Sequence, residues 1–205
     1  MYKGEFFNSI SHIVGAVAAL VGLVIVVVAA VQQGDPWKIV SFSIYGTTLF
    51  LLYTFSALYH SLQGRSKLIF RKLDHLSIYF LIAGTYTPFA LVTLRGAWGW
   101  TIFGIIWGLV IVGVVLELLP KTGNRTWSVV VYILMGWLII IALKPLLKAL
   151  PAGGFIGLLF GGIFYTGGLV FYSLGGRVKH FHGIWHLCVL TGSVSHYLTI
   201  LFYVA

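Results

Sequence analysis

Residues 10–31 have the sequence ISHIVGAVAALVGLVIVVVAAV and contain no Asp, Glu, Lys or Arg. A helix that crosses the hydrocarbon core of a bilayer needs about 20 mainly apolar residues, and this run is long enough. It exceeds the roughly 7–15 apolar residues of a signal-peptide core, and no convincing small-residue cleavage site follows it. We therefore interpret the run as a retained membrane span.

The remainder of the chain repeats this pattern. Of the 205 residues, 60% are hydrophobic and 8% are charged, whereas soluble domains carry about 25% charged residues. Apolar runs of spanning length are separated by breaks too short to hold a folded unit outside the membrane. The runs cover residues 10–31, 39–62, 75–94, 98–119, 127–147, 155–174 and 184–204. The sequence predicts an all-α integral membrane protein, a seven-transmembrane helix bundle in which residues 1–205 form one domain.

Positive charge predicts the orientation. The chain has 13 Lys and Arg against 4 Asp and Glu, and in short loops such cations set topology and meet anionic lipid head groups, so no nucleic-acid partner is expected. With seven spans, the N-terminal side holds Lys3, Arg65, Lys67, Arg71, Lys72, Lys121, Arg125, Arg177 and Lys179. The other side holds Lys38, Arg95, Lys144 and Lys148. We expect a cytoplasmic N-terminus, an outside C-terminus, and a solvated pair of Glu117 and Lys121.

Histidines gather at one membrane depth. The segment HGIWH places His182 and His186 at i and i+4, so both rings can reach one metal ion. His60 lies at the same depth in the second span, with Ser56 one turn deeper on the same face. Asp74 supplies a carboxylate at the mouth of the third span. Three imidazoles with an open water position are typical of zinc, and one cysteine cannot make a Cys-rich zinc or iron–sulfur site.

Each of these residues also has a plainer interpretation. His60 alone could be an interfacial histidine without a ligand. Asp74 could cap the third helix, where a carboxylate favours the N-terminal dipole. The Ser56 hydroxyl could bond its own helix backbone one turn back.

Five further polar residues are expected to support the site. They are Glu5, Asn8, His12, Ser193 and His196. The first three repeat at helical spacing, so their face could turn inward behind the ligands. His196 lies roughly 15 Å deeper than His186, too far to bind the same ion. We expect it to make a buried polar link with Ser193 or another span.

Taken in order, these motifs resemble the hemolysin III family, the bacterial branch of the progestin and adipoQ receptor superfamily, which is related to alkaline ceramidases. They are Glu5-x-x-Asn8-Ser9-x-x-His12, Ser56-x-x-x-His60, Phe70-Arg-Lys-Leu-Asp74-His75 followed by Ala83-Gly-Thr-Tyr-Thr-Pro88, and His182-x-x-x-His186 with Gly192-Ser193-x-x-His196. The resemblance covers essentially the whole chain. It implies seven spans in a bacterial cytoplasmic membrane, zinc held by His60, His182 and His186, and a water held by Asp74.

These features predict a zinc-containing membrane protein that hydrolyses an amide or ester of a lipid. Asp74 would orient or deprotonate a zinc-bound water, and Ser56 would hydrogen-bond the developing oxyanion. The sequence does not decide whether the protein is an enzyme, and two other functions are considered. One is a membrane-perturbing, pore-forming protein, and the other is a regulator of membrane state, each with a structural zinc. The expected partners are the lipid bilayer and, for a hydrolase, a lipid substrate; the oligomeric state and the substrate are not determined.

Overall fold

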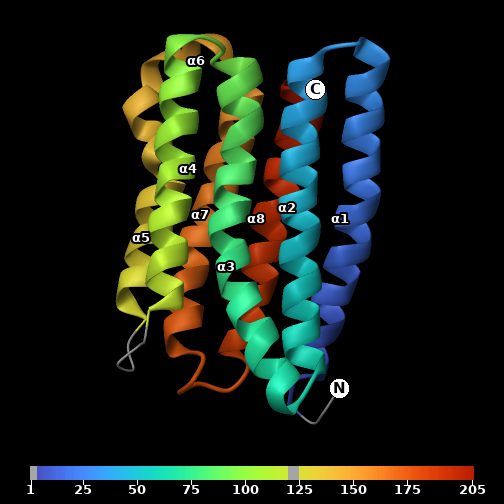
Figure 1. The fold of residues 1–205 in the computed structure, drawn as a ribbon, viewed down its shortest axis with the longest axis vertical. Helices are drawn as coiled ribbons and strands as arrows, with labels where there is room; N and C mark the ends of the chain where they lie inside the picture. The colour runs from blue at the N-terminus through green and yellow to red at the C-terminus, as the bar shows by residue number, and fades with distance from the viewer. Residues whose placement is uncertain (1–3, 120–124) are drawn as a thin grey trace.

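A computed structural model describes residues 4–119 and 125–205 of the protein. In these two ranges the chain is helical and contains no strand. Seven of the described helical segments are long and apolar enough to cross a membrane, which confirms the predicted helix bundle. Figure 1 shows them side by side, with the two chain ends at opposite ends of the bundle. Lys3 and Lys121, two cations of the orientation argument, lie outside the described residues, and the orientation stays a prediction.

The spans follow one another through short connections. They are α1 (Phe6–Gln33), α2 (Pro36–Ser61), α3 (Gly64–Pro88) with its π-helical end η1 (Phe89–Thr93), α4 (Ala97–Leu118), the interrupted span α5 (Thr126–Gly136), η2 (Leu138–Ala142) and α6 (Leu143–Ala149), then α7 (Ala152–Leu174) and α8 (Phe181–Tyr203). The first connection shows why they can be short. Gly34 ends α1 with φ 68°, a left-handed conformation that glycine adopts without strain. Asp35 then caps α2 by accepting a hydrogen bond from the Trp37 backbone N–H at 2.8 Å.

The third helix begins earlier than the sequence predicts. Residues 63–74 were expected to form a break, but α3 begins at Gly64 and carries four basic residues on its first turns. Lys, Arg and Leu are good helix formers, and no proline interrupts them, so the helix continues beyond the apolar segment. Asp74 consequently lies well inside α3 and not at its N-terminus. The interpretation of Asp74 as a helix cap is therefore wrong.

The fifth span, one apolar run over residues 127–147 in the sequence, is broken near Pro145. A 3₁₀ segment separates α5 from α6, and Pro145 lies within the short α6. Tyr86 of α3 satisfies backbone groups that this break sets free. Its hydroxyl donates to the Gly136 carbonyl at 2.9 Å and accepts from the Ile139 N–H at 2.9 Å. An unsatisfied backbone group in lipid costs several kcal/mol, so these two bonds stabilise the break.

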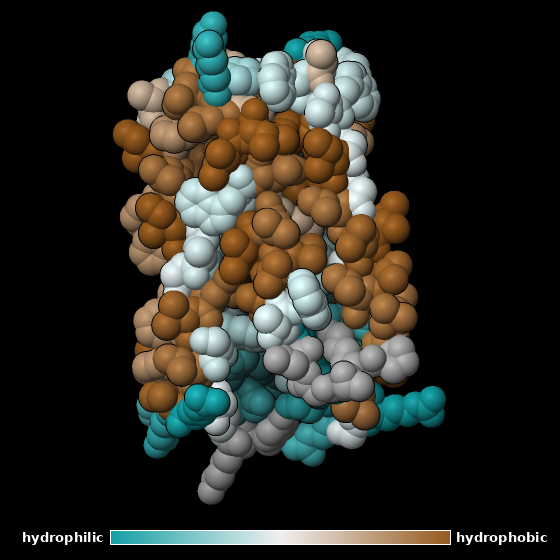
Figure 2. Space-filling model, turned by 90° about the vertical axis from the view of Figure 1, so that its left-hand side faces the viewer, coloured by the Kyte–Doolittle hydropathy of each residue, from teal (hydrophilic) through white to brown (hydrophobic). Residues whose placement is uncertain are grey.

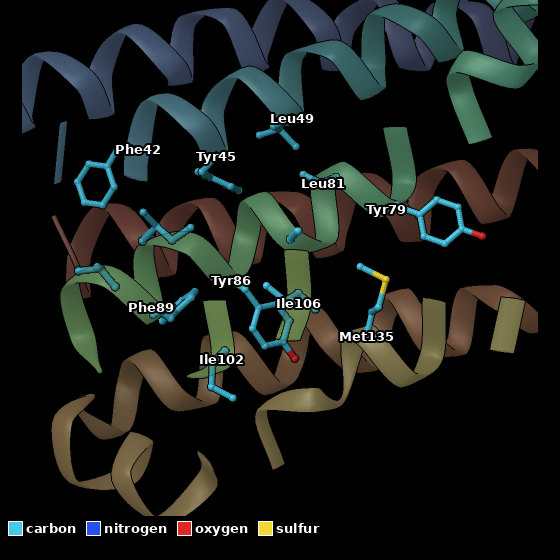
Figure 3. Close-up of a cluster of buried hydrophobic side chains, with 14 of the residues drawn as sticks. Phe42, Tyr45, Leu49, Tyr79, Leu81, Tyr86, Phe89, Ile102, Ile106 and Met135 are labelled. Atoms are coloured by element: carbon cyan, nitrogen blue, oxygen red, sulfur yellow. The ribbon is translucent and has the colours of Figure 1, made fainter. Parts of the chain in front are cut away.

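The middle of the bundle is packed around α2 and α3. Of the apolar window of the third span, 67% is buried, against 17% for α7, so α3 is the central helix and α7 lies mostly at the surface. Ten of the core side chains, labelled in Figure 3, come from α2, α3, η1, α4 and α5: Phe42, Tyr45, Leu49, Tyr79, Leu81, Tyr86, Phe89, Ile102, Ile106 and Met135. Residues of α1, η2, α6 and α8 also belong to this core. On the outside, apolar side chains form a belt between polar ends (Figure 2). This belt is the surface that faces lipid.

Candidate metal centre

Four histidines meet at the N-terminal end of the bundle. We call them the histidine cluster: His12 of α1, His60 of α2, and His182 and His186 of α8. The ring centroids of His60 and His186 are 4.8 Å apart, and those of His182 and His186 are 4.7 Å apart. One ring nitrogen from each of His60, His182 and His186 lies within 4.8 Å of the others. Because ligand nitrogens on a tetrahedral zinc are about 3.3 Å apart, small side-chain rotations bring all three onto one ion.

Glu5, immediately before α1, sets the orientation of His60. The Nδ1 atom of His60 lies 2.7 Å from Oε2 of Glu5, and Asn8 donates to the same oxygen at 2.9 Å. Lys67 of α3 lies 3.4 Å from the other carboxylate oxygen. A carboxylate on Nδ1 keeps the proton there and leaves the Nε2 lone pair free for a metal. Glu5 and Asn8 therefore occupy the supporting positions that helical spacing suggests.

His12 holds His186 in a similar way. His186 Nδ1 lies 2.5 Å from His12 Nε2. Nε2 of His186 is buried and has no hydrogen-bond partner within the described part of the chain. A buried polar atom without a partner costs about 1–3 kcal/mol, and a metal ion would remove that cost. The three imidazoles thus fit zinc by geometry, by donor type and by this unpaired nitrogen.

Ser56 and Asp74 share a cavity with these histidines. The cavity measures about 700 Å³, and residues of α1, α2, α3, α4, α7 and α8 line it. Its wall includes all three candidate ligands together with His12, Ser56 and Asp74. The Ser56 hydroxyl interacts with the Asp74 carboxyl group. The structure therefore brings together the residues that the sequence assigns to ligation and to water activation.

Ser193 and His196 lie deeper and do not line this cavity. Ser193 Oγ accepts from the Tyr53 hydroxyl at 2.8 Å and lies 2.7 Å from the Tyr165 hydroxyl. The Nε2 atom of His196 donates to the Leu158 carbonyl of α7 at 3.0 Å. These contacts join α8 to α2 and α7. The two residues connect helices at a greater membrane depth than the histidine cluster, and they do not contact its four histidines.

A second polar cluster was missed by the sequence reasoning. We call it the arginine cluster: His75 of α3, Glu117 of α4, Arg125 immediately before α5, and Tyr172 of α7. His75 Nδ1 lies 3.1 Å from Glu117 Oε1, and Arg125 Nη1 donates to His75 Nε2 at 2.5 Å. Arg125 also donates to the Tyr172 hydroxyl at 2.9 Å and to Glu117 Oε2 at 3.4 Å. His75, Glu117, Arg125 and Tyr172 all line the same cavity.

Glu117 is therefore not in a solvated pair, since its side chain is only 4% exposed. Lys121, the expected partner, lies outside the described residues. The sequence did hold a signal. Glu117 interrupts the apolar stretch VVLELL, and an acidic residue inside a span is expensive unless it is paired within the protein.

A second cavity of about 420 Å³ adjoins the first. Its wall is mainly apolar and comes from α3, η1, α5, η2, α6, α7 and α8. Ile78, Tyr172 and Trp185 belong to the walls of both cavities. On the face of the molecule in Figure 2, polar surface gathers at the lower, N-terminal end, below the apolar belt. The apolar space thus extends from the polar cavity into the membrane-spanning part of the bundle.

The fold and the cluster define a class, a seven-helix membrane protein with three histidines at one end of the bundle. A comparison with known proteins identifies the family within this class. The family "Haemolysin-III related" matches residues 1–197, and the chain belongs to this family.

"Hemolysin-3" of Bacillus cereus is 45% identical over 203 residues, which cover 98% of this chain and 92% of the relative. "Hemolysin-3 homolog" of Bacillus subtilis (strain 168) is 42% identical over 202 residues, which cover 98% of this chain and 94% of the relative. "Monocyte to macrophage differentiation factor" of Homo sapiens is 27% identical over 175 residues, which cover 81% of this chain and 71% of the relative. The resemblance to the hemolysin III family and its receptor superfamily is confirmed. Together with the seven apolar helices, it supports a multi-pass protein of the cell membrane.

Proposed function

We propose that this protein is a zinc-dependent hydrolase of an amide or ester bond in a lipid. The observation that carries the proposal is the convergence of three imidazole nitrogens within 4.8 Å on a cavity that Asp74 and Ser56 also line. Catalytic zinc sites have three protein ligands and an open position, whereas a fourth protein ligand makes a site structural. In the described part of the chain the group able to hold one ion comprises three histidines and no carboxylate. This supports an open position.

Each side chain has a role in the proposed reaction. A zinc ion at this site would polarise the substrate carbonyl and make water more acidic. Asp74 orients the attacking water and accepts its proton. Ser56 donates a hydrogen bond to the carbonyl oxygen on which negative charge develops. Glu5 and His12 keep the rings of His60 and His186 turned so that their Nε2 atoms face the cavity.

A lipid substrate is supported by the adjoining apolar cavity. Its wall shares Ile78, Tyr172 and Trp185 with the polar cavity. A lipid whose acyl chain lies in the apolar cavity would therefore have its polar end in the polar cavity. The bond to be cleaved would then lie at the boundary of the two cavities.

Replacement of Asp74 and Ser56 tests the enzymatic role, because neither residue is a proposed zinc ligand. Asp74→Asn should reduce the rate by about 100- to 10,000-fold, since the general base is lost. Ser56→Ala should cost at most roughly 3 kcal/mol of transition-state stabilisation, as expected for one oxyanion hydrogen bond. The assay is release of fatty acid from ceramide-like amides and lysolipid esters in mixed micelles. Both variants should keep their zinc, and Ser173→Ala, a change at an exposed serine on α7, is the matched control.

The names of the bacterial relatives favour a second function. Two of them are called hemolysin-3, so a membrane-perturbing protein with a structural zinc between α2 and α8 is the competing proposal. Liposome leakage measured on the same preparations separates the two functions. Hydrolysis lost in Asp74→Asn with leakage unchanged supports the enzyme. A wild-type protein that turns over no lipid in the panel, while its leakage activity requires zinc, supports the membrane-perturbing protein.

A further inference from the structure

Charged side chains are distributed unequally on the wall of the polar cavity. Among the residues that the structure describes, three are cations, Arg71, Lys72 and Arg125, and two are carboxylates, Asp74 and Glu117. Formally, the described part of the wall has one positive charge in excess, because it carries three cations and two anions. A divalent metal on the histidine cluster raises the excess to three. A cavity with one predominant sign of charge attracts ligands of the opposite sign.

The pairing within the wall leaves two of these cations available. Glu117 is occupied by Arg125 and His75. Arg71 and Lys72 are exposed, and neither forms an ion pair with another residue that the structure describes. Basic residues are expected at this end of the bundle for reasons of topology. Topology does not require that two of them line the cavity next to a metal site.

Arg125 has unused hydrogen-bonding capacity. Its terminal nitrogens donate to His75, Tyr172 and Glu117. Its Nε–H is buried and has no partner among the described residues. Buried guanidinium donors are normally satisfied, and the acceptors that suit them best are carboxylate and phosphate oxygens.

The two polar clusters face each other across a short distance. The Tyr59 ring lies 4.5 Å from the His60 ring and 6.5 Å from the His75 ring, measured between centroids. A small polar group can therefore contact the metal side and the arginine side of the cavity together. The attached chain would follow the shared wall of Ile78 and Trp185 into the apolar cavity.

From this distribution of charge we propose that the polar cavity binds the phosphate-bearing head group of a lipid through Arg71, Lys72 and Arg125. Phosphate suits this wall better than carboxylate does, because it carries up to two negative charges on three oxygens and three cations surround it. The lipid's chain occupies the apolar cavity. The inference rests on the proposed hydrolase only in calling this lipid a substrate; the binding site stands on the charges and the cavities.

Direct binding tests the site in protein solubilised in an uncharged maltoside. The ligands are hexadecyl phosphate, hexadecyl glycerol ether as an uncharged analogue of equal chain length, and inorganic phosphate. The variants are the double substitution Arg71→Gln and Lys72→Gln, and a matched control, Arg177→Gln and Lys179→Gln. The control removes two exposed cations from the turn after α7, which do not line the cavity. Thermal midpoints and size exclusion confirm that both double variants fold.

Hexadecyl phosphate should bind wild type at least roughly tenfold more tightly than the uncharged ether does. Each cation near a lipid phosphate contributes about a fivefold gain in affinity, so the cavity variant should lose roughly 25-fold and the control little. Equal binding of charged and uncharged ligands, or equal losses in the two double variants, overturns the site. If inorganic phosphate displaces the alkyl phosphate at similar concentrations, the site binds free phosphate, and the proposal of a lipid ligand is overturned.

Turnover of an uncharged ceramide-like amide, measured in parallel, separates this inference from the proposed hydrolase. If the protein hydrolyses the amide but binds hexadecyl phosphate no better than the uncharged ether, only the head-group site is contradicted. Preferential binding without turnover of any lipid, in zinc-loaded protein, contradicts the hydrolase and keeps the head-group site. Binding measured before and after chelation shows how much of the affinity comes from the metal.

Discussion

The histidine cluster and the arginine cluster both line one cavity, and each contains a histidine bonded to a carboxylate. The pairs are His60 with Glu5 and His75 with Glu117. In the arginine cluster the second nitrogen of His75 is also occupied, because Arg125 donates to it. In the histidine cluster Nε2 of His186 is buried and unpaired. Buried polar atoms are normally satisfied, so the unpaired Nε2 of His186 marks a place for a metal ion. In the arginine cluster the ring of His75 is fully bonded, and the unpaired atom is the Nε–H of Arg125, a donor that suits an anion.

The two clusters also connect different helices. The histidine cluster joins α1, α2 and α8, while the arginine cluster joins α3, α4, α7 and the start of α5. Residues of both clusters line the same cavity. Similar residues therefore serve different purposes there: the histidine cluster offers a nitrogen lone pair to a metal ion, and the arginine cluster joins four segments and offers a cationic donor.

Breaking the arginine cluster should have the largest effect on stability. Arg125→Met leaves the buried Glu117 carboxylate without its guanidinium, and loss of one partner of a buried ion pair costs about 3–5 kcal/mol. The thermal midpoint in detergent should fall while the zinc content stays unchanged. Adding Glu117→Leu should recover most of the stability, since an apolar pair can replace a buried ion pair. A single variant as stable as wild type would show that the cluster does not hold these helices together.

Removing the metal should have the next largest effect, and it should act on the other cluster. A ligand bound only by the folded protein, at a hundredfold excess over its Kd, stabilises by about 2.7 kcal/mol. Chelation should therefore lower the thermal midpoint of both wild type and Arg125→Met, because Arg125 is hydrogen-bonded to none of the three proposed ligands. His186→Ala should not respond to the chelator. An unchanged wild-type midpoint after verified zinc removal would mean that helix packing alone fixes α2 and α8.

Weakening the support of a ligand should have the smallest effect. Glu5→Gln keeps a hydrogen bond to His60 but removes the charge, and such changes typically reduce metal affinity by about 10- to 100-fold. The matched control is Glu117→Gln, which makes the same change in the arginine cluster and should leave zinc affinity unaltered. Competition with a chromogenic zinc chelator measures both affinities. Equal losses in the two variants would contradict the distinction between the clusters.

The fold and the candidate ligands could be predicted because their signals are local. Apolar length alone identifies the spans, and span order then puts His60, His182 and His186 at one membrane depth. The start of α3 was missed because a basic, polar helical extension has no apolar periodicity that distinguishes it from a loop. Asp74 was consequently expected at a helix end, although it lies within α3.

The arginine cluster could not be assembled from the sequence for a different reason. Its members come from four segments, and their contacts depend on how each helix is rotated about its axis. Arg125 was counted as a loop cation and Glu117 as a solvated residue. Only packing against α3 and α7 brings His75 and Tyr172 to them.

The number of zinc ions per chain shows whether His60, His182 and His186 bind a metal. Purified wild-type protein, reconstituted with zinc and analysed by mass spectrometry of the metal, should contain about one zinc per chain, as a single three-histidine site requires. His182→Ala and His186→Ala should each lose most of it, while His196→Ala, which changes a histidine outside the cavity, should keep it. Full occupancy in both the His182 and the His186 variants, or no zinc in the reconstituted wild type, would contradict the account.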